Sequence, residues 1–218
     1  MILALAIGAA GGNAGAKGLE GAAGLRPVAN SVAVGQVTYK GRRALQLRDL
    51  AFEGAEDRMV LLPIADFHDG VIEAEIAGRP QAGAPEGARG FIGIAFRVQA
   101  DPGRYEAFYI RPTNGRAEDQ LRRNHAVQYI SMPDHSWHKL RERTPGLYES
   151  YADMVPGEWT KFRIEVRGDK ARLFLNGQPQ PVLIVNDLKL GAAASGGVAL
   201  WVANATEGYF SNVRVRKQ

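Results

Sequence analysis

The stretch Val71-Ile72-Glu73-Ala74-Glu75-Ile76 decides the fold class. Its apolar residues recur at every second position, so Ile72, Ala74 and Ile76 share one face of an extended chain. The two glutamates lie on the opposite face. This two-residue period is typical of a β-strand with one buried and one solvated side.

The same period recurs along most of the chain after residue 31. Gly168-Asp169 and Asn176-Gly177 supply turn residues for tight hairpins, so residues 162–185 are expected to form a three-stranded meander. Parallel strands would need helical crossovers, and no long stretch shows helical spacing. The sequence predicts an all-β antiparallel sandwich with strands at residues 32–39, 44–48, 58–62, 71–76, 92–97, 105–111, 162–167, 171–175, 181–185, 198–203 and 209–216.

Composition narrows the class of protein. The chain has 218 residues, of which 45% are hydrophobic and 23% charged, as expected for one globular domain with a substantial core. Its formal net charge is +4, without a Lys/Arg tract or an aromatic RNA-binding signature, so we expect no nucleic-acid partner. The absence of cysteine excludes disulfides, zinc-thiolate sites and thiol nucleophiles.

The N-terminus carries an export pattern. Residues 1–10 are an apolar run, and Ala14-Gly15-Ala16 has the small-x-small form that precedes signal cleavage. We expect residues 1–16 to be a signal peptide, residues 17–218 to be a single domain, and the protein to be periplasmic or secreted. A flexible Gly/Ala-rich tail is the alternative for residues 1–16. No other segment approaches the ~18 apolar residues of a membrane span.

Several stretches resemble a known superfamily. Residues 67–76 (FHDGVIEAEI), 93–97 (GIAFR) and 105–109 (YEAFY) are similar to successive strands of concanavalin A-like lectins and glucanases. Residues 157–164 (GEWTKFRI) and 171–177 (ARLFLNG) resemble its laminin-G-like and 3-keto-glycoside-hydrolase-like members. The resemblance implies a jelly-roll sandwich over about residues 30–216. It also implies a carbohydrate ligand, the commonest theme among these lectin-like, hydrolase, lyase and adhesion domains.

Glu73 and Glu75 are a candidate pair of catalytic carboxylates. Retaining glycosidases need two carboxyl groups about 5–5.5 Å apart, and residues i and i+2 share one strand face. The family-16 glucanases of the superfamily carry a longer acidic motif, and Ala77 and Gly78 stand where its last carboxylate belongs. A solvent-facing, structural role is therefore the preferred interpretation.

Residues 112–157 interrupt the strand pattern and are a better candidate for a binding site. Sugars stack on aromatic rings, and their hydroxyl groups bind the amide, carboxylate and guanidinium groups that this stretch offers. We expect this insertion to cover the concave face of one sheet. The expected ligand-binding residues are Arg97, Tyr109, Arg111, Asn114, Arg122, Gln128, Tyr129, Trp137, Tyr151 and Trp201.

Charge suggests what kind of saccharide the insertion would bind. Between Arg111 and Arg143 there are seven Lys or Arg residues and four Asp or Glu residues. This stretch therefore has a net charge of +3, whereas the whole chain has +4. Arginine favours bidentate contact with carboxylates, sulfates and phosphates, which suggests a polysaccharide or oligosaccharide with acidic groups. The alternative is that these arginines stabilise the long loop, by pairing Arg116, Arg122 and Arg123 with Glu118, Asp119 and Glu142.

The histidines of the insertion suggest a second chemistry. An enzyme would use His125 or His138 as a base, with Glu149 or Asp119 as its partner. The spacing from His135 to His138 is not the His-x-x-x-His of a helical zinc site, so no metal and no cofactor is assigned. Calcium, used by laminin-G-like and pentraxin-like relatives, is an alternative that would draw on Asp69, Asp101, Asn186 and Asp187.

Three functions follow from these observations. The first is a lectin-like carbohydrate-binding domain. The second is a carbohydrate-active enzyme, a glycoside hydrolase or lyase of the 3-keto-glycoside-processing type. The third is a structural or adhesion domain without a small ligand.

Overall fold

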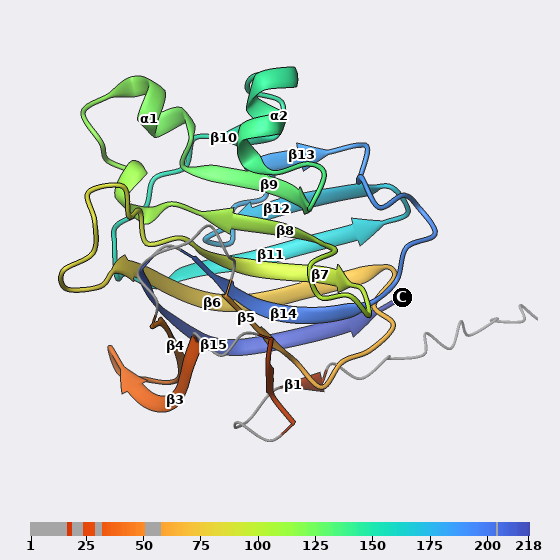
Figure 1. Ribbon diagram of the computed structural model, residues 1–218, viewed down its shortest axis with the longest axis horizontal. Helices are drawn as coiled ribbons and strands as arrows, with labels where there is room; N and C mark the ends of the chain where they lie inside the picture. Colours follow the sequence, from red (N-terminus) through yellow and green to blue (C-terminus); the bar gives the residue numbers. More distant parts are fainter. Residues whose placement is uncertain (1–16, 19–23, 29–31, 51–57, 204) are drawn as a thin grey trace, which may run out of the picture.

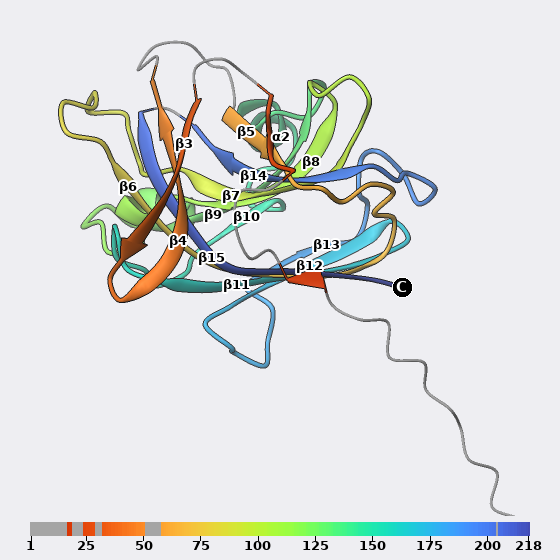
Figure 2. The ribbon, with the colours of Figure 1, turned by 90° about the horizontal axis from the view of Figure 1, so that it is seen from below.

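Two stacked antiparallel β-sheets make up the protein (Figures 1 and 2). The computed structural model describes residues 17–18, 24–28, 32–50, 58–203 and 205–218. The predicted signal peptide, residues 1–16, lies outside the described residues. The predicted antiparallel sandwich is confirmed.

The first sheet has eight strands within the described residues. In spatial order they are β13 (Leu183–Val185), β12 (Lys170–Leu175), β11 (Thr160–Arg167), β6 (Gly70–Pro80), β15 (Thr206–Lys217), β4 (Arg42–Asp49) and β3 (Val32–Tyr39), with β1 (Lys17–Gly18) also paired to β15. The predicted meander is the antiparallel run β11, β12, β13.

The second sheet has seven strands over the same ranges. Their order is β10 (Glu149–Ser150), β9 (Val127–Met132), β8 (Tyr105–Ile110), β7 (Ile92–Val98), β14 (Gly197–Val202), β5 (Arg58–Leu61) and β2 (Arg26–Pro27). The period-two alternation places the strands correctly because side chains of neighbouring residues point to opposite faces.

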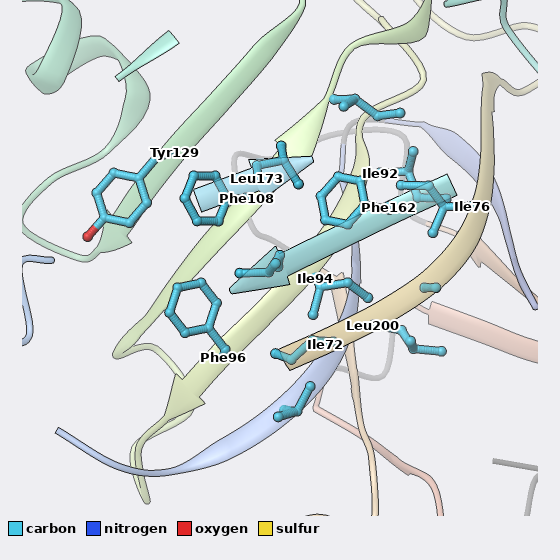
Figure 3. Packing of buried hydrophobic residues seen from close by; sticks show 14 of the residues in the cluster. Ile72, Ile76, Ile92, Ile94, Phe96, Phe108, Tyr129, Phe162, Leu173 and Leu200 are labelled. Carbon is cyan, nitrogen blue, oxygen red and sulfur yellow. The ribbon is translucent and has the colours of Figure 1, made fainter. Parts of the chain in front are cut away.

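The main core lies between the sheets (Figure 3). Ile72, Ile76 and Phe162 of the eight-stranded sheet are at most 1% exposed, as are Ile94 and Leu200 of the seven-stranded sheet. Burying one such side chain stabilises the fold by roughly 1.5–3 kcal/mol. This core makes the sandwich a rigid support for side chains on its outer surfaces.

The outer face of the seven-stranded sheet is also buried. A second apolar cluster lies there, made of Met59, Ala95, Val98, Tyr105, Ala107, Tyr109, Ile130, Ala199, Trp201 and Ala203. The strands β7 and β8 are therefore buried on both sides, unlike β11, whose outward residues are exposed or half-buried.

Residues 112–157 are partly folded. They contain the 3-10 turn η1 (Pro112–Asn114), two short helices, α1 (Gln120–Asn124) and α2 (Trp137–Arg143), and the strands β9 and β10. In Figure 1 both helices stand beside β9 and β10, at one edge of the seven-stranded sheet. None of the helices in the described part of the chain is long and apolar enough to cross a membrane.

Glu73 and Glu75 lie on the outer face of the other, eight-stranded sheet. Glu73 Oε2 is 3.0 Å from Arg216 Nη2, and Glu75 Oε1 is 2.7 Å from Arg42 Nη1. The two carboxylates thus form surface ion pairs, as the structural interpretation expected, on the sheet that does not carry the insertion.

Candidate functional site

A row of aromatic rings and guanidinium groups crosses the outer face of the seven-stranded sheet. The rings of Tyr109 and Trp201 stack with centroids 4.6 Å apart, and Trp201 Nε1 donates a hydrogen bond of 3.3 Å to Tyr105 Oη. The Arg111 guanidinium carbon lies 4.9 Å from the Tyr109 ring centroid and 5.9 Å from that of Trp137. We call these five residues the aromatic ladder.

Only one end of the aromatic ladder is open to solvent. Tyr105, Tyr109 and Trp201 are each 2% exposed and Arg111 is 5% exposed, whereas Trp137, the first residue of α2, is 45% exposed. An exposed indole at the end of a buried row gives this face an accessible apolar surface surrounded by polar groups.

Arg111 is held by neutral acceptors. Its Nη2 donates 2.7 Å to Tyr109 Oη, and its Nη1 donates 2.9 Å to the His125 carbonyl and 3.3 Å to Gln128 Oε1. Gln128 is fixed in turn, because its Nε2 donates to the carbonyls of Tyr129 and Tyr148. The planar groups at the base of the site are therefore rigidly oriented.

His125, Glu149 and Arg141 meet beside the aromatic ladder. Arg141 donates two hydrogen bonds to Glu149 Oε2, from Nε at 3.1 Å and from Nη2 at 2.7 Å. His125 Nδ1 is 2.8 Å from the same oxygen, yet this buried nitrogen has no directed hydrogen bond, so the contact is one of proximity rather than alignment. Arg141 also lies 4.8 Å from the Trp137 ring, which joins the two groups of residues.

Burial lowers the pKa of His125, with Arg141 and Arg111 lowering it further and Glu149 opposing them. The imidazole is therefore neutral at pH 7, the form that accepts a proton. A neutral imidazole close to a carboxylate combines a possible general base with a group that would stabilise its protonated form.

Asn114 and Arg122 border the same region. Asn114 Nδ2 donates 3.1 Å to the His125 carbonyl, and Arg122 Nε donates 3.0 Å to Asn114 Oδ1. Of the residues predicted from sequence, the structure thus gathers nine: Tyr109, Arg111, Asn114, Arg122, His125, Gln128, Trp137, Glu149 and Trp201.

Arg97 and Tyr129 lie elsewhere, in the interior. Arg97 is fully buried and donates to the carbonyls of His68, Gly168 and Gly191. Tyr129 Oη donates 2.8 Å to Glu106 between the sheets. Neither side chain is on the face that the sequence assigned to it.

His138, Asp119 and Tyr151 are also outside this group. His138 is exposed on α2 and contacts Ser136 Oγ, and Asp119 caps α1 by accepting 2.6 Å from the Arg122 backbone N–H. Tyr151 is 42% exposed and accepts a hydrogen bond from Arg123.

The ion pairs proposed for the loop arginines differ from those observed. Arg116 pairs with Asp153 at 2.7 Å. Arg122 and Arg123 bind neutral acceptors, so the predicted pairs with Glu118, Asp119 and Glu142 do not form among the described residues.

Comparison with family models identifies the chain. Residues 58–216 match the model described as "3-keto-alpha-glucoside-1,2-lyase-like domain". The chain belongs to this family. A comparison with curated protein sequences found no match.

Solved structures share this fold at low sequence identity. The carbohydrate-binding module CBM66 from Bacillus subtilis has a TM-score of 0.61 and 14% identity over 89% of this chain and 96% of that chain. A Bacillus subtilis protein of unknown function with a galectin-like fold has a TM-score of 0.57 and 12% identity over 89% of each chain. The VIP36 exoplasmic/lumenal domain, in a Ca2+/Man3GlcNAc-bound form, has a TM-score of 0.53 and 9% identity over 89% and 83% of the two chains. These similarities establish the concanavalin A-like sandwich.

Some residues of the site in this lyase-like domain were not expected from the sequence. One of them, Arg141, lies in α2. The other, Phe91, lies immediately before β7, and its ring centroid is 6.2 Å from that of Tyr109. Arg141 lay within the basic stretch, but no local pattern distinguished it from the other arginines. Phe91 carried no signal because its contact with Tyr109 depends on strand pairing.

The residues suggested for calcium are dispersed in the structure. Asp69 lies beside Arg97, Asp101 caps the Gly103 N–H, and Asp187 pairs with Lys189. Within the described ranges, no group of three or more His, Cys, Asp or Glu side chains is placed to hold a metal ion.

Proposed function

We propose that the insertion and the exposed end of the aromatic ladder, at Trp137, form a saccharide-binding site. The observation that carries this proposal is the exposed Trp137 indole at the open end of the aromatic ladder, beside the guanidinium groups of Arg111 and Arg141. A sugar ring stacks on an indole, and its hydroxyl groups bind oriented polar groups such as the half-buried guanidinium of Arg122. Two structures of similar fold are named as a carbohydrate-binding module and a Man3GlcNAc-bound domain, which supports this choice of ligand.

A glycan screen by thermal shift tests this proposal. A saccharide at 100 times its Kd adds about 2.7 kcal/mol to the free energy of unfolding. Trp137→Ala should weaken binding of each hit about tenfold, as expected when an aromatic anchor is truncated. Leu147→Ala is the matched control, because Leu147 lies in the same insertion and is 54% exposed. If no glycan stabilises the protein, a structural or adhesion role replaces the proposal.

A second function, catalysis, is favoured by the 2.8 Å approach of His125 to Glu149. In a 3-keto glycoside the carbonyl acidifies the hydrogen on C2. His125 would take this proton as the C1–C2 double bond forms and the bond from C1 to the leaving oxygen breaks. Glu149 would stabilise the imidazolium that results. The imidazolium would then give the proton to the leaving oxygen, so that an alcohol departs and His125 is neutral again.

Incubation with a 3-keto glucoside, followed by NMR detection of the released alcohol, tests for catalysis. His125→Gln should abolish release while retaining saccharide affinity. Release that persists in His125→Gln assigns the base elsewhere, and the absence of release from the native protein leaves binding as the function.

We also propose that the domain acts outside the cytoplasm, on the basis of the apolar residues 1–10 and Ala14-Gly15-Ala16. Expression with a C-terminal tag in a Gram-negative host, followed by fractionation and N-terminal sequencing, tests this. Processing near Lys17 is the expected result, and unprocessed cytoplasmic protein would contradict it.

A further inference from the structure

Three arginines at the candidate site have no carboxylate partner. The guanidinium groups of Arg89, Arg111 and Arg122 donate to carbonyl, amide and hydroxyl oxygens. Within the ranges that the structure describes, no Asp or Glu oxygen lies within ion-pair distance of any of them. Buried and half-buried charges are normally paired, because removing an ion from water is costly.

Arg111 is the deepest of the three. It is 5% exposed, and its hydrogen bonds go to Tyr109 Oη, the His125 carbonyl and Gln128 Oε1. Burial lowers the pKa of Arg111, with repulsion from Arg141 and Arg89 lowering it further and Tyr109 and Glu149 opposing them. The base of the site therefore carries a positive charge that, among the described residues, no carboxylate contacts directly.

Arg89 and Arg122 are both half-buried and meet at the turn η1. Arg122 donates 3.2 Å to Thr113 Oγ1 and 3.0 Å to Asn114 Oδ1, while the Thr113 N–H donates 3.3 Å to the Arg89 carbonyl. Asn114 also donates to the His125 carbonyl, the acceptor that Arg111 uses. Thr113 and Asn114 thus lie between the main chain of Arg89 and the guanidinium groups of Arg111 and Arg122.

Three carboxylates near the site are already engaged with other groups. Glu149 holds Arg141 and lies beside His125, Asp119 caps α1, and Asp153 pairs with Arg116. Burial and then repulsion from Arg122 lower the pKa of Arg89, while the charge of Glu86 opposes them. A bound anion would relieve this repulsion.

We infer that the site selects saccharides that carry an oxyanion, a uronate carboxylate or a sulfate. Arg89 and Arg122 contact the oxyanion at the rim, and Arg111 attracts it from the base of the site. Arginine suits this role because its fork of N–H groups matches the two oxygens of a carboxylate or sulfate. The inference rests on the proposed saccharide binding and narrows it to one class of ligand.

Calorimetry with paired probes tests this selectivity. Uronate oligosaccharides from alginate, pectin and hyaluronan are each compared with their carboxyl-reduced forms, and chondroitin sulfate oligosaccharides with desulfated ones. At low salt the charged member of a pair should bind at least about tenfold more tightly, and added salt should shrink this ratio. The uronate and sulfate pairs distinguish the two sources of the oxyanion.

Variants then locate the selectivity. Arg89→Gln and Arg122→Gln should each lower the charged-to-neutral affinity ratio several-fold. Arg123→Gln is the matched control, because Arg123 lies on the same helix but binds Tyr151, and it should keep the ratio. Unfolding curves verify that each variant is folded.

The results distinguish oxyanion selectivity from saccharide binding itself. Equal binding of charged and neutral members overturns the oxyanion selectivity but leaves saccharide binding intact. A ratio unchanged by Arg89→Gln and Arg122→Gln overturns the assignment to these arginines. Failure of every probe to bind, together with a glycan screen without hits, overturns both.

Discussion

Arg97 carries a positive charge in the interior of the sandwich, and its neighbours explain why it is tolerated there. Its guanidinium donates to three carbonyls and lies 3.3 Å from Asp69 and 3.6 Å from the buried Glu106. Arg97→Met would remove a donor from these carbonyls and the positive charge beside Glu106, whose remaining contacts are the Tyr129 hydroxyl and the Leu190 N–H. We predict a loss of about 3–5 kcal/mol in the free energy of unfolding, measured with urea.

The control for Arg97 is Arg163→Met on β11. Arg163 pairs with Glu165 on the surface, and both side chains are 38% exposed. Exposed pairs contribute only about 0–1 kcal/mol, so this variant should unfold almost like the native protein. Similar losses in the two variants would mean that the interior network is not what Arg97 stabilises.

His125 offers a direct test of its contact with Glu149. Burial lowers the pKa of His125, and Glu149 is the main group that raises it. Glu149→Gln removes that opposition, so the pKa of His125 measured by NMR titration should fall further. The pKa of His135, which responds to burial and to Lys189 and Arg143, should not change. A rise at His125 would show that the carboxylate does not act on it.

The pairing of β7 with β8 depends on Gly93, which faces Tyr109 across the two strands. A Cβ at Gly93 would lie 2.1 Å from the Phe108 carbonyl oxygen and 2.6 Å from Tyr109 Cα. Gly93→Ala should therefore separate the two strands and lower the free energy of unfolding by about 1–3 kcal/mol. It should also weaken saccharide binding, because Tyr109 is displaced.

Gly35→Ala on β3 is the matched control for Gly93→Ala. A Cβ there meets nothing within 4 Å, so stability should change by less than about 0.5 kcal/mol. Both variants are compared by urea unfolding and by calorimetry with any glycan that binds. Equal effects would argue against a special role for the β7–β8 contact.

Strand positions were predictable because alternation is a local property, whereas deviations from alternation were not. Arg97 follows the inward residues Ile94 and Phe96, so the two-residue period places it outward. The chain instead bulges there: Arg97 has a φ of 50°, and the pairing with β14 shifts by one residue between Gly197 and Val198. The extra residue redirects the side chain into the interior.

The candidate site was predictable in composition but only partly in geometry. The basic and aromatic stretch correctly indicated Arg111 and Trp137. The contact of Glu149 with His125 arises because β10 pairs with β9, which brings together residues 24 positions apart. No local pattern encodes such pairing. Tyr129 was assigned by residue type, although its place in the strand, next to Gln128, directs it inward.

At the scale of the whole molecule, buried titratable groups set how stability depends on pH. Burial lowers the pKa values of His125 and His135 below 6.5 and raises that of Glu106 above 4.5. The folded state therefore binds histidine protons less tightly than the unfolded chain does. The histidine contribution to stability is complete above pH 6.5 and is lost as the pH falls through the folded values.

The raised pKa of Glu106 has the opposite effect on the pH dependence of stability. The folded state holds its proton more tightly than the unfolded chain, so this contribution is present below pH 4.5 and is lost as the pH rises through the folded value. Urea unfolding across pH 4–8 should show stability falling from pH 7 toward pH 5. The double variant His125→Gln, His135→Gln should flatten that slope, and Glu106→Gln should remove the partial compensation at lower pH. An unchanged slope in the double variant would assign the pH dependence to other groups.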